Sequence, residues 1–326
     1  MAKVSIIVPV YNTAEYLKRS MDALVGQSLE DIEIIIVNDG STDSSMDILN
    51  EYAERFPKKV RIIVKENGGQ GSARNLGIKS ATGDYIGFAD SDDYVDIDMF
   101  RAMYQKAVEE NADIVECSFH FVLEKENGEI KDLPPRGTVK QHPDNRDMFM
   151  NPQVSPWNKL YKRQILQDNN IIFPEGLIYE DTSFYIKSIP YISKMSYVDE
   201  KYVYYFLRSK STMNANTGKR VENIFDVVDD MVSFYKEKGF YDQYKEELEY
   251  FCVKILLCSS LSRIGRIKDR ELEDRLLDRT FVYIKEKFPN YKENRFFTGK
   301  IGIYIKNIRR IYAKPIGRVL GKVMKG

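Results

Sequence analysis

Two aspartates separated by one residue, Asp90 and Asp92, lie at the end of an apolar run that reads DYIGFADSDD from Asp84 to Asp93. If the run is a strand, residues two apart share a face, so both carboxylates point the same way and Ser91 points opposite. Two oxygen ligands on one side suit a hard divalent cation, Mg²⁺ or Mn²⁺, which keeps waters and takes phosphate oxygens as further ligands. An acidic turn that caps the next helix is the alternative, and this stretch alone does not decide between the two.

Three more polar side chains, Tyr11, Asp39 and Arg74, lie in the segments that follow other apolar runs. An aromatic ring can stack on a flat base, a carboxylate can accept the imide N–H of uracil, and a guanidinium can grip a phosphate or a carbonyl. Each also has an ordinary explanation, as a core aromatic, a turn-former before Gly40 and a solvated helix residue. Their joint occurrence with the carboxylates at successive strand ends favours a nucleotide site.

The elements that must position these residues are short strands alternating with helices. Periodicity and turn residues predict strands at 4–10, 32–37, 60–64 and 85–89. They also predict three helices: one at 13–25, one that follows the turn at 38–43 and ends near 55, and one from 71 to about 82. Strand then helix, with connections of a few residues, predicts an α/β fold with a mostly parallel sheet covered on both faces. Ligands of such sheets bind beyond the carboxyl ends of the strands, where the four polar positions would meet.

The rest of the chain changes character twice. We expect a helix at 98–111, a strand at 114–123, a long surface excursion at 124–151, strand structure at 197–207 and amphipathic helices beyond Ser211. The simplest division is a catalytic α/β domain at 1–215, a helical region at 216–293 and a basic amphipathic tail at 294–326.

Composition excludes several classes of protein. The 326 residues carry 49 basic and 49 acidic side chains, so no overall field draws the chain to nucleic acid. Three cysteines without paired spacing fit reduced thiols, and two histidines give no cage of Cys and His for a metal. No apolar segment approaches the ~20 residues that span a bilayer, and the N-terminus lacks the layout of a secretion signal. We therefore expect a cytoplasmic protein that is soluble or peripheral.

Two common nucleotide motifs are absent where they would be needed. A dinucleotide fold requires its glycine pattern directly after the first strand, where this chain has Pro9, Val10 and Tyr11. A P-loop requires Gly-Lys-Ser/Thr at the end of a glycine-rich loop, and the stretch 217–220 lacks that spacing. A nucleotidyltransferase also requires a basic, glycine-rich loop after the first strand, and residues 9–13 do not supply one.

Four blocks of the first hundred residues resemble the signatures of the family 2 glycosyltransferases, which have the GT-A fold. They read VSIIVPVYN at 4–12, IIIVNDGSTD at 34–43, NGGQGSARNLGI at 67–78 and FADSDD at 88–93. Three later blocks are similar to those of bacterial members that build surface glycans: WNKLYKR at 157–163, FPEGLIYEDTSF at 173–184 and YYFLRSKS at 204–211. The resemblance covers roughly the first 215 residues.

The resemblance implies roles on the donor side. Pro9, Tyr11 and Asp39 would hold the uridine of a UDP-sugar, and Arg74 would reach toward the base or the diphosphate. Two residues of the last block would close over the diphosphate, namely Arg208 and Ser211.

The resemblance also implies a metal and a catalytic base. Asp90 would sit near the ribose and the metal, Asp92 would bind Mn²⁺ or Mg²⁺ directly, and phosphate oxygens and water would complete the set, since no histidine follows His142. Asp181 would be the base, with Glu180 shaping the acceptor site. A helix cap before 182–189 is the ordinary explanation of that acidic pair.

Trp157 is the only tryptophan and is open to two interpretations. It can stack on an acceptor sugar, or it can belong to the core.

These residues together predict an inverting, metal-dependent glycosyltransferase. It would move glucose, galactose or an N-acetylated form from UDP to a glycan or lipid-linked acceptor in bacterial capsule, exopolysaccharide or cell-wall glycan synthesis. The alternative is a catalytically inactive module that binds nucleotide sugars or glycans.

The tail has nine Lys or Arg and no acidic residue from 294 to 326. Its apolar residues Ile301, Ile305, Ile308 and Tyr312 fall on one helical stripe, which Ile316, Val319 and Val323 resume. A basic amphipathic segment of this kind can lie on an anionic membrane. The resemblance implies acceptors that are often lipid-linked at the cytosolic leaflet, so we expect the protein to be peripheral on the inner face of the plasma membrane. The alternative is a terminal helix packed on the helical region, and the tail's glycines weaken its helix propensity.

Overall fold

A computed structural model describes residues 2–124, 130–133, 146–207 and 218–323. The chain divides into two compact units. We call the first the sheet unit, made of 1–145, 153–176 and 180–208, and the second the helical unit, made of 146–152, 177–179 and 209–326.

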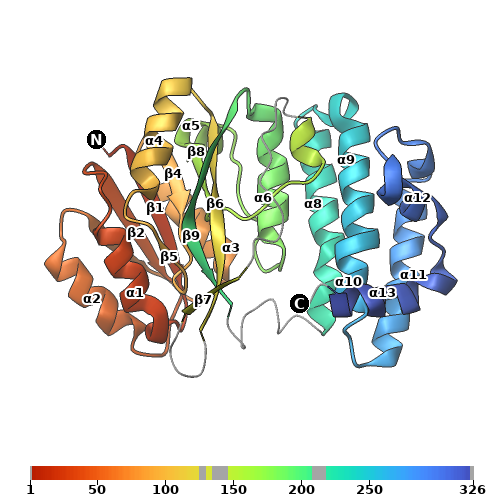
Figure 1. Cartoon of the computed structure of the whole chain (residues 1–326), viewed down its shortest axis with the longest axis horizontal. Coiled ribbons are helices and arrows are strands. Elements are labelled where there is room, and N and C mark those ends of the chain that lie inside the picture. Colours follow the sequence, from red (N-terminus) through yellow and green to blue (C-terminus); the bar gives the residue numbers. More distant parts are fainter. Residues whose placement is uncertain (1, 125–129, 134–145, 208–217, 324–326) are drawn as a thin grey trace. The chain divides into compact units, whose positions relative to one another are not determined.

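The sheet unit is built on one nine-stranded mixed sheet (Figure 1). Its strands are β1 (Val4–Val10), β2 (Ile32–Asn38), β3 (Val60–Val64), β4 (Tyr85–Phe88), β5 (Tyr94–Val95), β6 (Ile114–Glu124), β7 (Ile130–Leu133), β8 (Lys159–Lys162) and β9 (Met195–Phe206). They follow the order β3-β2-β1-β4-β8-β6-β9-β5, and β7 pairs with β6. The helices of this unit are α1 (Ala14–Val25), α2 (Ser45–Arg55), α3 (Gln70–Ser80), α4 (Met99–Glu110), α5 (Arg163–Asp168), α6 (Glu180–Ser188) and the 3-10 turn η2 (Ile189–Tyr191).

The first four strands are parallel, as predicted, because a helix returns the chain after each of the first three. One face of β1 carries Val4, Ile6, Val8 and Val10, which pack in a core with residues of α1, α2 and α4. The opposite face carries Ile7, against which a β-carbon on Gly77 of α3 would come within 2.3 Å. Helices therefore cover both faces, and the apolar runs of these strands reflect burial on both sides.

The second half of the sheet was only partly predicted. β8 runs antiparallel between β4 and β6, and sequence patterning did not indicate it. The 124–151 segment is not wholly a surface excursion, since β7 pairs with β6 and the 3-10 turn η1 (Asp147–Phe149) buries Met148 and Phe149.

Thr13, the residue before α1, does not cap that helix with its side chain and instead donates a hydrogen bond to Ser91 Oγ over 3.0 Å.

The helical unit consists of helices, and its elements besides η1 are η3 (Lys219–Glu222), α8 (Asn223–Glu237), α9 (Tyr241–Ile255), the π-helical turn η4 (Leu256–Ser260), α10 (Leu261–Ile264), α11 (Arg270–Lys287), η5 (Tyr291–Glu293), α12 (Gly299–Asn307) and α13 (Arg310–Val323). The three predicted amphipathic helices correspond to α8, α9 and α11. Their apolar stripes are buried, for example at Val228, Leu248 and Leu276.

The tail packs inside the helical unit through small residues. A β-carbon on Gly265 would come within 2.2 Å of Gly317 of α13, and one on Gly321 within 2.9 Å of the Ser262 carbonyl. The glycines that lower helix propensity thus permit α13 to approach α10 at backbone distance. α13 is also tied to α11, because Arg318 binds Glu273 over 2.8 Å and Lys314 binds Asp274 over 2.7 Å.

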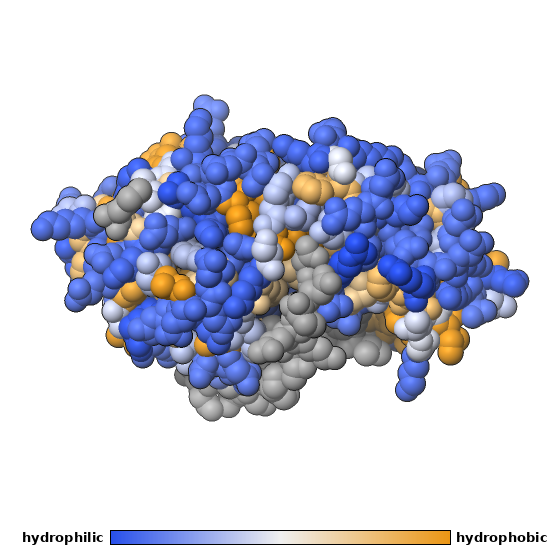
Figure 2. Space-filling model, turned by 90° about the horizontal axis from the view of Figure 1, so that it is seen from above, coloured by the Kyte–Doolittle hydropathy of each residue, from blue (hydrophilic) through white to orange (hydrophobic). Residues whose placement is uncertain are grey.

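The tail's single apolar stripe is a wrong prediction. Ile305 and Ile308 are buried, whereas Tyr312 and Val319 are more than half exposed. The helical periodicity of the apolar residues is interrupted because Ile308 takes an extended conformation between α12 and α13. The face in Figure 2 is mostly hydrophilic, with small separate apolar patches. Within the described ranges, no helix is both long and apolar enough to cross a membrane.

Candidate active site

Loops at the carboxyl ends of β1 and β2 brace one another. Asn12 has a left-handed backbone, with φ of 52°, and its side-chain oxygen accepts the backbone N–H of Thr42 over 2.8 Å. In return Asp43 Oδ2 accepts the N–H of Ala14, the first residue of α1. Tyr11 stands beside this junction with its ring 49% exposed, and Pro9 is buried in β1 opposite Val37. An exposed ring on a braced loop is suited to stacking on a base.

Asp39 is buried beyond β2 and organises the glycine-rich loop before α3. Its Oδ1 accepts hydrogen bonds from Lys65 Nζ (2.7 Å) and the Gly68 N–H (2.9 Å), and its Oδ2 accepts the Gly69 N–H (2.8 Å). Asp39 is therefore more than a turn-former. Lys65 went unrecognised in the sequence, because a lysine after a strand carries no motif of its own.

Arg74 is the centre of the site. Its guanidinium is 2% exposed and donates from Nη2 to Asp90 Oδ1 over 2.7 Å and from Nη1 to Glu180 Oε1 over 3.0 Å. The two carboxylates come from distant parts of the sequence, one after β4 and one at the start of α6. The solvated-helix explanation of Arg74 is thereby excluded, and the residue bridges the predicted donor and acceptor sides.

Burial and neighbouring charges set the protonation of this group. Burial would lower the pKa of Arg74, but the charges of Asp90 and Glu180 outweigh it and raise that pKa. Burial, assisted by the charge of Asp181, raises the pKa of Glu180 to about 7 against the opposing effect of Arg74. Glu180 is thus a carboxyl that exchanges its proton near neutral pH.

Helix α3 holds the segment that leads to α6. Asn75 donates to the Phe173 carbonyl over 2.9 Å and accepts the Phe173 N–H over 2.8 Å. A β-carbon on Gly71 would lie 2.9 Å from the Pro174 carbonyl and 3.4 Å from Glu180 Cγ. These two positions were not singled out in the sequence, because their role appears only when residues a hundred positions apart are brought together.

The carboxylates Asp90, Asp92 and Asp93 lie in a turn after β4, so the alternation rule for strands does not apply to them. Asp90 Oδ1 is shared by Arg74 and Gln70. Asp93 is buried and its Oδ1 accepts the Phe206 N–H over 2.8 Å, which fixes the end of β9. Asp92 stays half-buried in the same turn.

The protein side chains alone do not complete the coordination of a divalent cation at this turn. Within the described part of the chain, no group of three or more His, Cys, Asp or Glu side chains could enclose a metal ion. Asp90 and Asp92 supply carboxylate oxygens on one turn, which is typical of Mg²⁺ or Mn²⁺ sites that rely on substrate phosphates and water.

Asp181 follows Glu180 in the first turn of α6, and its Oδ1 accepts the Thr182 N–H over 2.7 Å. The positive end of a helix stabilises both carboxylates. The preceding residue, Tyr179, has φ of 70°, a conformation that costs a non-glycine residue about 1 kcal/mol. Strain of this kind is found at functional sites more often than elsewhere.

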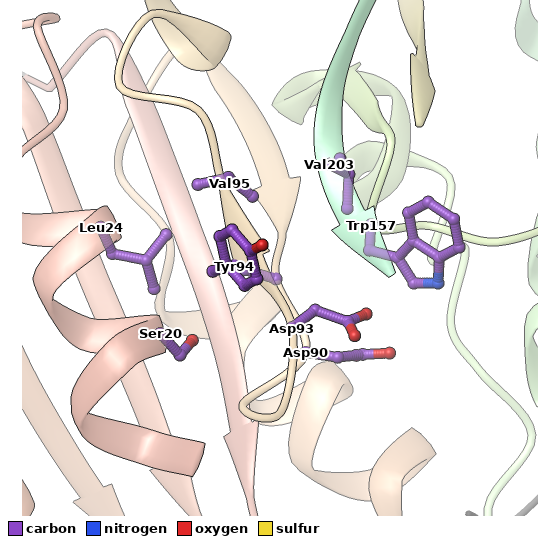
Figure 3. A pocket seen from close by; sticks show the side chains of 9 residues that line it. Ser20, Leu24, Asp90, Asp93, Tyr94, Val95, Trp157 and Val203 are labelled. Carbon is purple, nitrogen blue, oxygen red and sulfur yellow. The ribbon is translucent and has the colours of Figure 1, made fainter. Parts of the chain in front are cut away.

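A small pocket adjoins the acidic turn (Figure 3). Asp90 and Asp93 point toward the side on which Trp157 lies. Trp157 is 6% exposed, stacks on Tyr205 at 5.2 Å and meets the Phe119 ring edge-on at 4.8 Å. This packing matches the core alternative, and the acceptor role of Trp157 stays a prediction. The two residues expected to close over the diphosphate, Arg208 and Ser211, lie outside the described residues.

Comparison with known proteins now decides the family. The family model "Glycosyl transferase family 2" matches residues 5–169. The chain belongs to glycosyl transferase family 2. The predicted family and its glycosyltransferase activity are therefore confirmed.

Two relatives of this family 2 chain are themselves named glycosyltransferases. It is 33% identical over 282 residues to "Uncharacterized glycosyltransferase EpsJ" of Bacillus subtilis (strain 168), covering 82% of this chain and 80% of the relative. It is also 33% identical over 262 residues to "Poly(ribitol-phosphate) beta-glucosyltransferase" of Bacillus spizizenii (strain ATCC 23059 / NRRL B-14472 / W23), covering 76% of this chain and 39% of that relative.

A solved structure confirms the GT-A fold. S. aureus TarS 1-349 in complex with UDP-GlcNAc matches with a TM-score of 0.74 and 21% identity, covering 99% of this chain and 91% of that one.

We predict that Glu180→Gln removes a pH dependence of stability. The Glu180 pKa is about 7 in the folded state and about 4.3 in an unfolded chain. Between these two pH values the folded state holds a proton on Glu180 that the unfolded chain has released. The contribution of this proton to the free energy of unfolding is complete below pH 4 and is lost as the pH rises through 7. Wild type should lose up to about 3 kcal/mol relative to the variant across this window, measured by urea unfolding.

Glu54→Gln, on the exposed side of α2, is the matched control and should show no such window. A wild-type-minus-Glu180→Gln difference that stays constant from pH 4 to 8 would show that folding does not shift the pKa of Glu180.

Proposed function

We propose that this enzyme transfers a sugar from a UDP-sugar to a hydroxyl of a bacterial surface glycan, with inversion in one displacement. The observation that carries the proposal is the bridge of Arg74 between Asp90 and Glu180, because it brings the predicted donor-side and acceptor-side carboxylates to one guanidinium. The relatives support the substrate class, one named for poly(ribitol-phosphate) glucosylation and a structural neighbour holding UDP-GlcNAc. Catalysis is assigned to residues 1–215, with 216–293 and 294–326 as accessory parts.

On the donor side, Tyr11 would stack on the uracil, and Pro9 and Asp39 would shape its pocket. Asp39 already accepts three donors, so it would bind the base through remaining lone pairs while holding the loop at 67–69. Arg74 would hold Asp90 beside the ribose. Arg208 and Ser211 would approach the diphosphate.

Mn²⁺ or Mg²⁺ would be held by Asp92 and Asp90, together with the donor's phosphate oxygens. Bound there, the ion supplies electrostatic stabilisation of the charge on the departing diphosphate.

Asp181 is the proposed base. It takes the proton from the acceptor hydroxyl, whose oxygen forms a bond to the anomeric carbon while the bond from that carbon to the phosphate oxygen breaks and UDP leaves. Glu180 and Arg74 keep the first turn of α6 in place and set the local charge. Attack from the face opposite the leaving group inverts the configuration.

We predict that Asp181→Asn lowers the turnover number for UDP release at least about 100-fold, because no carboxylate then takes the proton. The assay screens UDP-glucose, UDP-galactose and their N-acetylated forms with Mn²⁺, and a chelator should abolish the signal. Asp168→Asn, on α5, is the control and should retain activity.

Turnover by Asp181→Asn close to wild type would refute the assignment of the base. UDP-sugar binding without UDP release in the wild type, with or without acceptor, would favour the alternative of an inactive binding module.

We also propose that α13 docks on an anionic membrane surface. The side of α13 away from its packed glycines exposes Ile311, Tyr312 and Val319, and the basic residues Arg309 and Lys322 are exposed beside them. Apolar side chains among cations fit the headgroup region of a bilayer with negative lipids. Four other tail cations, Arg295, Arg310, Lys314 and Arg318, already form ion pairs within the helical unit, so the basic surface left for a membrane is narrower than the sequence indicated.

We predict that Ile311→Ser with Val319→Ser lowers the partition coefficient onto phosphatidylglycerol vesicles, measured by sedimentation, at least about 100-fold, because burial of each side chain is worth about 1.5 kcal/mol and the two add to about 3 kcal/mol. The substitutions leave the packed glycine face intact. Val282→Ser, which is equally exposed on α11, is the matched control. Unchanged sedimentation of the double variant, or equal binding to neutral phosphatidylcholine vesicles, would refute this docking surface.

A further inference from the structure

A second pair of opposite charges is buried in the sheet unit, outside the residues assigned above. Glu116 of β6 and Lys159 of β8 are 1% and 0% exposed, face each other in register, and lie 3.3 Å apart between Oε2 and Nζ. Lys159 Nζ also donates to the Ser155 carbonyl and to Asn158 Oδ1, each over 2.9 Å, and to the Gln153 carbonyl over 2.5 Å. Donation to three oxygens uses all three N–H groups of an ammonium, which indicates the charged form. Burial lowers the pKa of Lys159 and raises that of Glu116, and the attraction between the two charges opposes both shifts.

This pair is a poor device for stability alone. Buried ion pairs rarely stabilise more than apolar residues of the same volume, and they do so only when every polar atom is satisfied. Within the described ranges, Glu116 Oε1 and the hydroxyls of Tyr161 and Tyr185 are buried without a hydrogen-bond partner. An incompletely satisfied polar cluster in a core indicates a role other than packing.

The cluster lies behind the proposed base. Tyr185 follows Asp181 by four residues in α6, so the two share a face of that helix. The Tyr185 ring lies 5.4 Å from Lys159 Nζ, so this face of α6 is turned toward the lysine. Tyr161 shares the face of β8 with Lys159, and its ring lies 5.4 Å from that of Phe184.

We propose that Lys159 is a positioning residue for the transfer reaction, whose buried ammonium, anchored by Glu116, keeps Asp181 ionised from the sheet side so that it accepts the acceptor's proton. The inference rests on the proposed function of Asp181.

Other charged groups also act on Asp181. Glu180 is the adjacent carboxyl and opposes ionisation, while Arg74 favours it but is already shared by two carboxylates. Burial raises the pKa of Tyr161 and of Tyr205, and the negative charge of Asp181 adds to the rise in both. Burial lowers the pKa of Lys159, and the negative charges of Glu116 and Asp181 act against that fall.

The test is the acid limb of the pH profile for UDP release, which belongs to the coupled Glu180–Asp181 pair. It uses the full chain with Mn²⁺ and whichever UDP-glucose, UDP-galactose or N-acetylated form the wild type turns over. Lys159→Met should move the acid limb to higher pH by roughly one unit, since the loss of one nearby positive charge raises the pKa of a carboxyl by about that amount. Glu116→Gln should move it down, because Lys159 then lacks its counter-charge. Lys159→Arg keeps the cation and should leave the limb near its wild-type position.

Lys187→Met is the matched control, since Lys187 is a buried lysine of the same helix α6, and it should not move the limb. Loss of packing alone would lower activity without shifting the limb, so equal positions for Lys159→Met, Glu116→Gln and wild type would overturn the inference. Shifts of both variants in one direction would overturn it as well. If Lys159→Met fails to fold, the Glu116→Gln shift decides. Retained turnover by Asp181→Asn would instead refute the proposed function itself.

Discussion

The buried guanidinium of Arg74 is the constraint on which the rest of the site depends. It is held between Asp90, which follows β4, and Glu180, which opens α6, and it has almost no access to water. A buried charge is tolerated only when it is paired and hydrogen-bonded, so the two carboxylates must meet it whenever the protein is folded. The same contacts therefore serve stability and the placement of groups for chemistry.

Neighbouring features follow from that requirement. α3 must lie close to Phe173 and Pro174, and Gly71 permits this because a β-carbon there would crowd the Pro174 carbonyl. Asn75 fixes the same segment with hydrogen bonds to both backbone groups of Phe173. On the other side, Asp39 draws in the loop at 67–69, where α3 begins. The helix that carries Arg74 is thus held at its start and along its side.

The sequence predicted the first half of the fold well, because β-branched strands buried on both faces and short helices have strong local signals. It also located Asp39, Arg74, Asp90 and Glu180, through their positions after apolar runs or within a known motif. It did not reveal that Arg74 pairs with Glu180, nor the roles of Asn75 and Lys65, because these depend on contacts between distant segments. The strand β8 was missed since four residues with two lysines show no strand pattern. The tail was misread because a period cannot be carried across the break at Ile308.

The central claim is that Arg74 joins the donor side of the site to the acceptor side. Its most direct test is the rate of UDP release by Arg74→Lys, compared with Arg61→Lys on the exposed strand β3. A lysine has one donor group in place of a fork and cannot bind both carboxylates in the same geometry. The account predicts that Arg74→Lys loses at least about 100-fold in turnover number while it still unfolds cooperatively, and that Arg61→Lys is unaffected. Near-normal turnover of folded Arg74→Lys would contradict it.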